Sequence, residues 1–338
     1  MTIIITGGAG FIGSHLVRYW LRRRGDRVVC IDALTYAGNM DNLADVMEDE
    51  RFSFVYGDVA DRARMYALFE ALRPEGVIHL AAESHVDRSI ADSAPFLSSN
   101  VTGTAVLLDA CRLYGVKRFH LVSTDEVYGD LPLHEGAPFT EEAPLRPSSP
   151  YAATKAAADM MTLAWGRTYG LGVTISRCSN NYGSHQFPEK LIPLTISHAL
   201  RGEAVPVYGD GKNVRDWLSV HDHCRAIEAV WERGREGTIY NVSARSERSN
   251  LAVVKAVLSI LGASESLISF VPDRPGHDRR YALDPARLEK DTGWQGSGDF
   301  EKGLAHTVSW YLDHKEWQAR ILSGAYKKNN DRYRKGSF

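Results

Sequence analysis

The stretch TIIITGGAGFIG, residues 2–13, decides how this chain folds. Its three consecutive isoleucines are typical of a strand buried on both faces of a parallel sheet. Gly7, Gly10 and Gly13 follow with the spacing G-x-x-G-x-x-G and lead into a helical pattern. A strand, a glycine-rich turn and a helix in this order predict the first unit of a dinucleotide-binding domain.

The glycines have separate tasks in such a turn. Gly7 permits the tight turn, Gly10 lets the backbone approach a pyrophosphate, and Gly13 lets the helix pack closely on the strand. The start of the helix, with Phe11 and Ile12, offers free N–H donors to anionic oxygens. A plain turn between strand and helix is the alternative, and the residues further along the chain argue against it.

Further apolar runs predict a doubly wound sheet. Each run is continuous rather than alternating, which marks strands covered by helices on both sides. Strands are expected at Val28–Asp32, Phe52–Tyr56, Val77–Ala81, Phe119–Ser123 and Val173–Cys178, with helices at roughly Gly13–Arg24, Arg62–Leu72, Val101–Tyr114 and Tyr151–Thr168. The sequence therefore predicts an α/β fold with a Rossmann-type parallel sheet over residues 1–180.

Past residue 180, prolines break the chain into shorter pieces. We expect residues 181–216 and 245–325 to form a smaller, mixed α/β lobe that binds the substrate. Between them, residues 217–244 are expected to return to the first domain, with Thr238–Val242 as one more strand. Residues 326–338 are rich in basic side chains and are expected to form a solvated C-terminal tail.

Asp32 predicts which dinucleotide binds. A carboxylate at the end of the second strand accepts hydrogen bonds from both ribose hydroxyls of an adenosine and repels a 2′-phosphate. Since the next residue is Ala33 rather than arginine, NAD is expected and not NADP. Asp58, Val59 and Ala81, which follow the third strand or end the fourth, are expected around the same cofactor. Capping of a loop is the alternative for Asp58.

A tyrosine and a lysine, Tyr151 and Lys155, are spaced by four at the start of an Ala-rich helix, after Pro150. Residues at this spacing are neighbours on one helix face. An ammonium group there stabilises phenolate over phenol, so it is expected to lower the pKa of Tyr151. The tyrosine could then take a proton from a substrate hydroxyl. A solvated Tyr and Lys pair is the alternative, which the dinucleotide motif disfavours.

An acidic pair follows the fifth strand in the segment Thr124-Asp125-Glu126. The ends of parallel strands line the ligand crevice of an open sheet. Two adjacent carboxyls there differ in pKa, because repulsion and partial burial raise one of them, and so provide an acid and a base together. The alternative is that Asp125 caps a loop and Glu126 is solvated.

Composition excludes several classes of function. The chain has 338 residues and a formal net charge of -2, so it offers no bulk positive field for nucleic acid or an anionic membrane. The cysteines lie far apart and are expected to be reduced and buried. The chain starts without a signal-peptide pattern, and a cytoplasmic protein is expected. His221 and His223 have a metal-like spacing but no evident third ligand, so no metal is expected.

These residues resemble the extended short-chain dehydrogenase/reductase family and, within it, the dTDP-glucose 4,6-dehydratases. The Thr124–Glu126 triplet discriminates, because the sister epimerases share the tyrosine, lysine and glycines but generally lack the acidic pair. Departures from the family pattern occur at Ala33, at Ser98-Ser99 and at Ser219–His221. The similar segments are Thr6–Gly13, Leu34–Asn39, Leu80–Ser89, Ser123–Gly129, Tyr151–Lys155, Ser179–Gly183, Gln186–Lys190, Asn213–Trp217 and Arg274–Tyr281.

The resemblance implies a lyase that oxidises C4 of a sugar nucleotide, eliminates water across C5 and C6, and returns the hydride to C6. It implies that Tyr151 takes the C4 hydroxyl proton, with Lys155 tuning it and Thr124 holding the same oxygen. Glu126 would remove the C5 proton, and Asp125 would protonate the departing C6 hydroxyl. The product would be a 4-keto-6-deoxy sugar nucleotide.

The resemblance also implies the remaining contacts of the site. It places the diphosphate on Arg215, Asn250 and Arg274 with His277 nearby, and the sugar on Ser84, Asn180 and Lys190. A homodimer is expected through the helices at Val101–Tyr114 and Tyr151–Thr168. The open alternatives are a nucleotide-sugar 4-epimerase, a 4,6-dehydratase acting on a UDP- or GDP-sugar, and an NAD-sensing protein without turnover.

Overall fold

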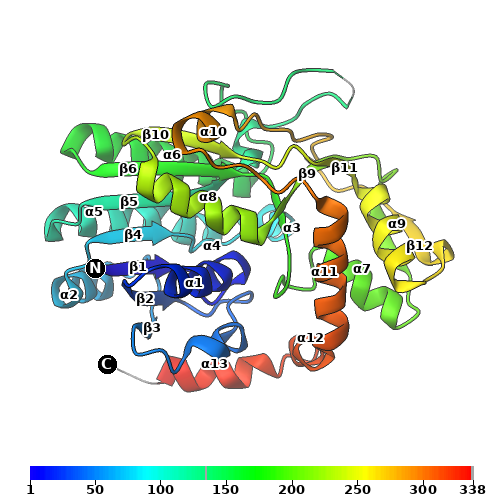
Figure 1. Ribbon diagram of the computed structural model, residues 1–338, viewed down its shortest axis with the longest axis horizontal. Helices are drawn as coiled ribbons and strands as arrows, with labels where there is room; N and C mark the ends of the chain where they lie inside the picture. The colour runs from blue at the N-terminus through cyan, green and yellow to red at the C-terminus, as the bar shows by residue number, and fades with distance from the viewer. Residues whose placement is uncertain (134, 336–338) are drawn as a thin grey trace.

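A seven-stranded parallel sheet runs through the centre of the protein (Figure 1). The structure is a computed structural model that describes residues 1–133 and 135–335. The strands are β1 (Thr2–Thr6), β2 (Arg27–Asp32), β3 (Phe52–Tyr56), β4 (Gly76–His79), β5 (Arg118–Thr124), β6 (Gly172–Cys178) and β10 (Thr238–Val242). Their order, β10-β6-β5-β4-β1-β2-β3, confirms the predicted doubly wound sheet.

Helices cover both faces of this sheet because alternate side chains of each strand point to opposite faces. Ile3 and Ile5 pack in one core and Ile4 in the other, all fully buried. Burial of each such side chain contributes about 1.5–3 kcal/mol. One layer contains α1 (Phe11–Arg23) and α8 (Val220–Arg233), and the other contains α2 (Arg62–Leu72), α5 (Thr104–Tyr114) and α6 (Pro150–Tyr169).

The strand order reverses at β1, which lies between β2 and β4. Such a switch point opens a crevice at the carboxyl ends of the two strands. Gly7 follows β1 with φ 71°, and a Cβ there would lie 2.6 Å from the backbone nitrogen of Ala81, which follows β4. Only glycine therefore fits, and the sheet holds the two turns side by side.

The smaller lobe is built from short elements at the carboxyl end of the sheet, on the right in Figure 1. Its strands form two small sheets, β11-β9-β7 and β12-β8, and α7 packs against α9 and α11. The elements are β7 (Asn180–Tyr182), α7 (Leu191–Leu200), β8 (Val205–Tyr208), β9 (Val214–Ser219), β11 (Glu247–Ser249), α9 (Asn250–Leu261), β12 (Ile268–Val271), α11 (Phe300–Asp313) and α12 (Lys315–Leu322). The chain returns to the large sheet in α8 and β10 before the small lobe is complete.

Short helical segments connect these parts. Around the crevice they are η1 (Met40–Val46), α3 (Val86–Ala91), α4 (Ala94–Phe96), η2 (Leu97–Gly103) and η3 (Asp125–Tyr128); elsewhere they are η4 (Glu265–Leu267) and α10 (Ala286–Thr292). The four cysteines are buried and free, as expected. Within the described ranges, no helix has the length and apolar character that a membrane span requires.

The expectation of a solvated tail from residue 326 is wrong. Tyr326–Lys335 form helix α13, which lies along the bottom of the molecule in Figure 1 against η1. Tyr326 and Asn330 are buried, because they occupy one face of the helix while Lys327 and Lys328 are exposed on the other. The segment is basic in composition, but its apolar and basic residues are spaced so that they fall on opposite faces of a helix. Residues 336–338 of the expected tail lie outside the described residues.

A buried ion pair joins α6 to β6. The Nε of Arg177 lies 2.8 Å from Oδ2 of Asp159, and the two side chains are 1% and 0% exposed. The Arg177 guanidinium also lies 4.7 Å from the centre of the Tyr128 ring. The pair therefore supports the short helix η3, which contains Asp125 and Glu126.

Asp159→Asn is expected to lower the free energy of unfolding by about 3 kcal/mol, because it leaves the Arg177 charge buried without a counter-charge. Denaturant unfolding followed by circular dichroism measures the change. Asp109→Asn is the matched control: its partner Arg62 is exposed, so a loss below about 1 kcal/mol is expected. Equal losses in the two variants would contradict the role of the buried pair.

Candidate active site

A cavity of about 430 Å³ opens at the carboxyl ends of β1, β4 and β5. It lies between the large sheet and the small lobe, and residues of both parts line it. Seventeen of the predicted site residues share this lining: Gly7, Gly10, Phe11, Ile12, Gly13, Asp32, Asp58, Val59, Ala81, Ser84, Thr124, Asp125, Glu126, Tyr151, Lys155, Asn180 and Lys190.

The glycine-rich turn forms one end of the cavity. Helix α1 begins after Gly10 without a side-chain cap, so the N–H groups of its first turn remain available to a ligand. A Cβ on Gly13 would lie 2.1 Å from the carbonyl oxygen of Gly7, so a side chain there would push the helix off the strand. The turn has the free donors and the close backbone approach that a dinucleotide diphosphate requires.

Asp32 sits beside this turn and is buried. Its Oδ2 accepts a hydrogen bond from the N–H of Ala9 (2.9 Å), and its Oδ1 accepts one from the N–H of Leu34 (2.8 Å). Burial raises the pKa of Asp32, and the two backbone donors oppose that change. Each oxygen keeps a further lone pair for a ribose hydroxyl. The residues present therefore fit an adenosine dinucleotide.

The position of Asp58 is consistent with a cofactor contact and with a cap of the loop. Its side chain is exposed and lines the cavity, and its Oδ1 also accepts a hydrogen bond from the N–H of Ala60 at 2.9 Å. This bond caps the turn after β3 and leaves the second carboxylate oxygen for a ligand. Capping and binding are thus compatible at this position.

The acidic pair enters the cavity where β5 ends. The Thr124 hydroxyl caps η3 by accepting a hydrogen bond from the N–H of Glu126 (3.3 Å), and it also donates one to Oδ1 of Asp125 (3.2 Å). Asp125 is 3% exposed. The cap holds two adjacent carboxyls at the carboxyl end of β5, in the same cavity as Tyr151.

The surroundings of Asp125 and Glu126 affect the pKa values of the two carboxyls differently. Burial raises the pKa of Asp125 well above its usual value, and the neighbouring negative charge of Glu126 raises it further. Burial also raises the pKa of Glu126, but the positive charges of Arg274 and Arg215 oppose it. Asp125 is therefore suited to give a proton and Glu126 to take one.

Tyr151 and Lys155 are both buried near the start of α6. Lys155 donates a hydrogen bond from Nζ to the carbonyl oxygen of Val122 at 2.8 Å. The predicted lowering of the Tyr151 pKa is wrong in direction, because burial raises it well above the usual value and the Glu126 charge adds to the rise. The Thr124 hydroxyl acts in the opposite direction. Helical spacing alone could not reveal the degree of burial.

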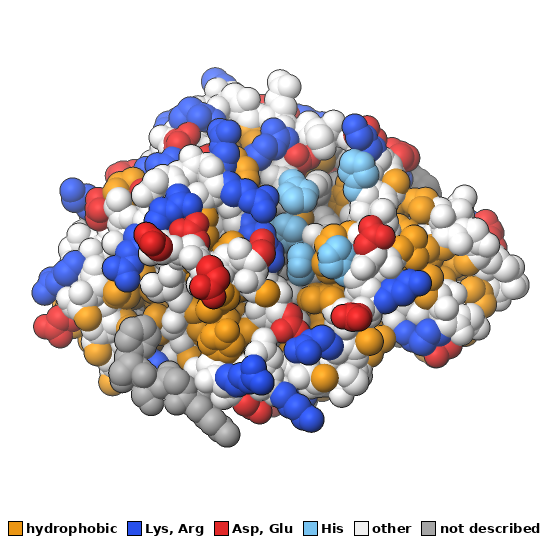
Figure 2. Space-filling model, turned by 60° about the horizontal axis from the view of Figure 1, so that its bottom comes forward, with side chains coloured by type: hydrophobic (Ala, Val, Ile, Leu, Met, Phe, Trp, Pro, Cys, Tyr) orange, Lys and Arg blue, Asp and Glu red, His pale blue; other side chains and the backbone are white. Residues whose placement is uncertain are grey.

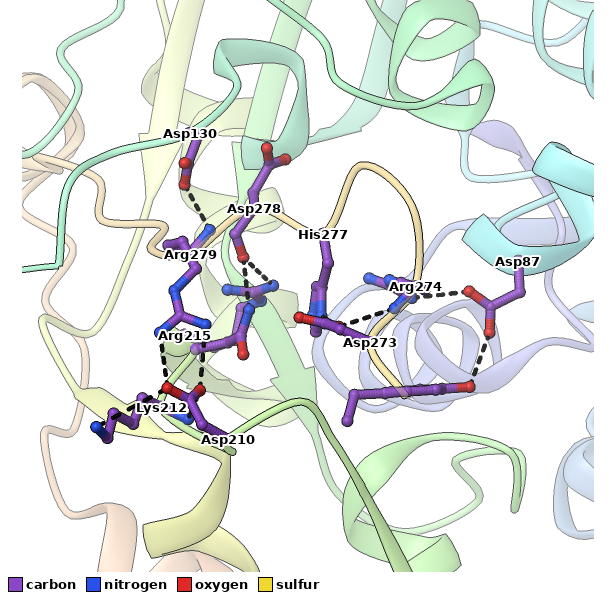
Figure 3. Close-up of polar contacts among 12 residues, drawn as sticks. Asp87, Asp130, Asp210, Lys212, Arg215, Asp273, Arg274, His277, Asp278 and Arg279 are labelled. Atoms are coloured by element: carbon purple, nitrogen blue, oxygen red, sulfur yellow. Dashed lines mark hydrogen bonds and ion pairs between the residues drawn. The ribbon is translucent and has the colours of Figure 1, made fainter. Parts of the chain in front are cut away.

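The predicted diphosphate residues do not belong to the lining of this cavity. Arg215 donates a hydrogen bond to the carbonyl oxygen of Asp278 (2.9 Å) and lies 4.3 Å from the centre of the Tyr281 ring. The positive charges of Arg274 and Arg215 oppose the rise that burial causes in the Glu126 pKa. Figure 3 shows the two arginines with His277 between them.

Asp87, an acidic residue of the first domain, bonds to Arg274. Asp87, in α3, accepts a hydrogen bond from Nη1 of Arg274 at 3.2 Å, as Figure 3 shows. It accepts another from the hydroxyl of Tyr208 at 3.3 Å. His277 bonds to Asp273 at 2.6 Å. Asn250 begins α9, and its N–H donates a hydrogen bond to the carbonyl oxygen of Asn213, two residues before Arg215.

Sequence reasoning missed several residues at the cavity. Trp317 and Ile321 of α12 line it although they come from the last part of the small lobe, and His185 lines it from the segment after β7. An amphipathic pattern in α12 was the available signal, but it could not tell which surface the apolar face would cover.

Histidines gather on the face shown in Figure 2. The His15 ring lies 5.6 Å from that of His185 and 5.1 Å from that of His221, whereas His223 bonds to Asn181 inside the protein. His221 and His223 therefore have different surroundings. Among the described residues, no group of His, Cys, Asp and Glu has the arrangement of a metal site.

Comparison with known proteins places the chain among nucleotide-sugar enzymes. Residues 4–307 match the model of the GDP-mannose 4,6 dehydratase family. A dTDP-glucose 4,6-dehydratase of Neisseria meningitidis is 48% identical, over 96% of this chain and 97% of its own length. One of Escherichia coli K12 is 47% identical, over 97% of both chains.

Solved structures of nucleotide-sugar enzymes share the fold of this chain. A dTDP-glucose 4,6-dehydratase of Streptomyces venezuelae, with NAD and dTDP bound, superposes with a TM-score of 0.92 at 46% identity, over 95% of this chain and all of that one. A UDP-glucose 4-epimerase of Thermotoga maritima reaches 0.86 at 32% identity, over 93% and 99% of the two chains. The fold is therefore shared by two activities, and the side chains of the cavity must separate them.

Proposed function

We infer the function from one premise: this chain belongs to the GDP-mannose 4,6 dehydratase family and, within it, to the dTDP-glucose 4,6-dehydratases. It is an NAD-dependent lyase that converts dTDP-glucose into dTDP-4-keto-6-deoxyglucose. The observation that carries this function is the placement of Asp125 and Glu126 in one cavity with Tyr151. An epimerase has no need of an acid and a base for the removal of water.

NAD, when bound beside Gly10 and Asp32, supplies a positively charged acceptor that takes the hydride from C4 and later returns it to C6. Tyr151 takes the proton of the C4 hydroxyl, and Thr124 holds the same oxygen with its hydroxyl proton, which turns from Asp125 to the substrate. Burial raises the pKa of Tyr151, so its phenolate depends on positive charge nearby. Lys155, whose Nζ is held by the Val122 carbonyl, is the residue that we propose supplies this charge. A ketone at C4 results, and it makes the C5 proton acidic.

Elimination then uses the acidic pair. Glu126 takes the C5 proton, while Asp125 gives a proton to the C6 oxygen, which leaves as water. Glu126 returns its proton to C5, and the proton that Tyr151 took passes to Asp125, so all three groups are restored for the next turnover. The sugar thus loses one water with no net change in the oxidation state of the cofactor.

The rest of the substrate lies between the two parts of the chain. We place the sugar against Ser84, Asn180 and Lys190, which line the cavity. The diphosphate extends toward Arg215 and Arg274, whose guanidinium groups suit two-point contacts with phosphate oxygens. His277 and Asn250 complete this end. The dinucleotide-binding part is residues 1–180 with 217–244, and the substrate lobe is the rest up to residue 325.

A substrate panel tests the activity. The purified protein with NAD is incubated separately with dTDP-glucose, UDP-glucose and GDP-mannose, and the products are analysed by mass spectrometry and NMR. Loss of one water from dTDP-glucose, without net reduction of NAD, is the expected result. An unchanged mass with inverted C4 would identify a 4-epimerase. Binding of NAD without any product would identify a sensor.

A homodimer is the expected assembly, through the outer faces of α5 and α6. Leu113, Met160 and Tyr169 are 49%, 46% and 51% exposed on these two helices. A second copy of the chain would cover these three side chains. The cytoplasm is the compartment that we expect for this enzyme.

Met160→Glu is expected to convert the dimer to a monomer, because a charge would be buried between the copies. Light scattering after gel filtration measures the mass. Leu312→Glu, an exposed apolar residue of α11, is the control that should stay dimeric. A monomeric wild-type protein would refute the proposal.

A further inference from the structure

Helix α13 contacts the loop that leads from Asp32 to η1. The Tyr326 hydroxyl donates a hydrogen bond to the carbonyl oxygen of Tyr36 at 2.6 Å. Asn330 donates one from Nδ2 to the carbonyl oxygen of Gly38 at 2.7 Å and accepts one from the N–H of Met40 at 3.1 Å. Asn330 is 1% exposed, so its amide is committed to this loop and shielded from water.

The same loop forms the adenosine side of the cavity. Its residues Thr35–Asn39 line the cavity next to Asp32. A Cβ on Gly38 would lie 2.9 Å from Oδ1 of Asp32, so the backbone that Asn330 holds is packed against the carboxylate itself. A shift of this backbone would therefore move the group that binds the ribose.

The loop needs external support because its backbone is strained. Leu34 has φ 49°, a left-handed conformation that is unfavourable for a residue with a branched side chain. Such conformations persist only where several contacts hold them. The Leu34 N–H donates to Asp32, and its carbonyl oxygen accepts from the guanidinium of Arg334 in α13.

A second line of contacts reaches the glycine-rich turn. The indole N–H of Trp317, in α12, donates to Oδ1 of Asn42 at 3.0 Å. The Nδ2 of Asn42 donates to the carbonyl oxygen of Ala9 at 2.9 Å, and the Asn39 N–H donates to the same oxygen at 3.0 Å. The C-terminal helices thus hold both the ribose loop and the diphosphate turn.

We propose that α13, chiefly through Asn330, is a clasp that positions the NAD site and sets how tightly the cofactor is held. The proposal rests on the proposed function only in the identity of the cofactor. A clasp suits a reaction in which the same NAD molecule gives back the hydride it has taken, because escape of the reduced cofactor between the two steps would strand the intermediate. Asn330 is a positioning residue, since it contacts the loop and not the reacting atoms.

The test compares Asn330→Ala with Lys328→Ala, an exposed residue of the same helix. NAD is removed from each full-length protein, and the Kd values for NAD and for dTDP are measured by calorimetry. Asn330→Ala should raise the Kd for NAD about tenfold, since two buried hydrogen bonds are lost, and leave the Kd for dTDP unchanged. Hydrogen exchange of the amides in residues 33–42 should become faster. Lys328→Ala should match the wild type.

Tyr326→Phe serves as the second variant in case Asn330→Ala does not fold. It removes one hydroxyl and keeps the ring, so a rise of about threefold in the Kd for NAD is expected. An unchanged Kd for NAD in the variants, or an equal loss of NAD and dTDP binding, would overturn the clasp. A wild-type protein that fails to bind NAD would instead overturn the proposed function, and the clasp with it.

Discussion

Glu126→Gln should lower the rate of water loss from dTDP-glucose about 10³-fold and leave the oxidation at C4 intact, because removal of a general base costs about 10² to 10⁴. Glutamine has the same shape and cannot take the C5 proton. Tyr151 and Lys155 are untouched, so the ketone still forms. In D2O, mass spectrometry should find no deuterium at C5 of the recovered sugar.

Asp125→Asn provides the contrast. It should also slow the loss of water, but C5 should still exchange with solvent because Glu126 remains.

In the wild-type enzyme, water loss should fall as the pH rises through the raised pKa of Asp125, since only the protonated carboxyl can give a proton. That fall should be absent in Asp125→Asn. Glu142→Gln, outside the cavity, is the control that should keep full activity. Exchange at C5 in Glu126→Gln would contradict the assignment of the base.

Tyr151→Phe should abolish every step, with a loss of about 10³-fold or more in product formation. The ketone at C4 is the condition for removal of the C5 proton, and without the phenol it does not form. Neither transfer of a C4 deuterium label to C6 nor exchange at C5 should therefore be seen. The Kd for NAD should stay within a few-fold of the wild-type value, because Asp32 and the glycine-rich turn are unchanged.

Tyr66→Phe is the matched control for this variant. The Tyr66 hydroxyl accepts a hydrogen bond from Arg62 on α2, and Tyr66 does not belong to the lining of the cavity. Its loss should leave the rate unchanged. If Tyr151→Phe retained exchange at C5, oxidation would not depend on the phenol, and the order of steps proposed above would have to be replaced.

Continuous apolar runs made the large sheet predictable, because strands that are buried on both faces must be apolar throughout. The limits of elements depended on contacts that the sequence does not display. The fourth strand was expected to reach Ala81, but β4 ends at His79. The Leu80 N–H is shared between the carbonyl oxygen and the hydroxyl of Thr6, and the Ala81 N–H bonds to the hydroxyl. The helix expected from Val101 begins earlier, in the wider turns of η2.

Motif spacing predicted the glycine-rich turn and the side chains that meet in the cavity, since each motif lies within one strand and the helix or turn that follows. It could not show the long-range effects. The effect of the Arg215 and Arg274 charges on the Glu126 pKa depends on how two separate segments of the small lobe return to the sheet. The direction of the Tyr151 pKa depends on burial, and the docking of Asn330 depends on a loop almost three hundred residues away.

The position of β10 has a consequence for how the protein is made on the ribosome. β6 is synthesised well before β10, the strand that pairs with it, because α7, β8, β9 and α8 lie between them in the chain. During that interval one side of β6 has open backbone N–H and C=O groups, which attract any other extended chain nearby. Nascent chains that stall before β10 emerges are thus the population most exposed to aggregation, and chaperone binding at this stage would protect the yield of enzyme.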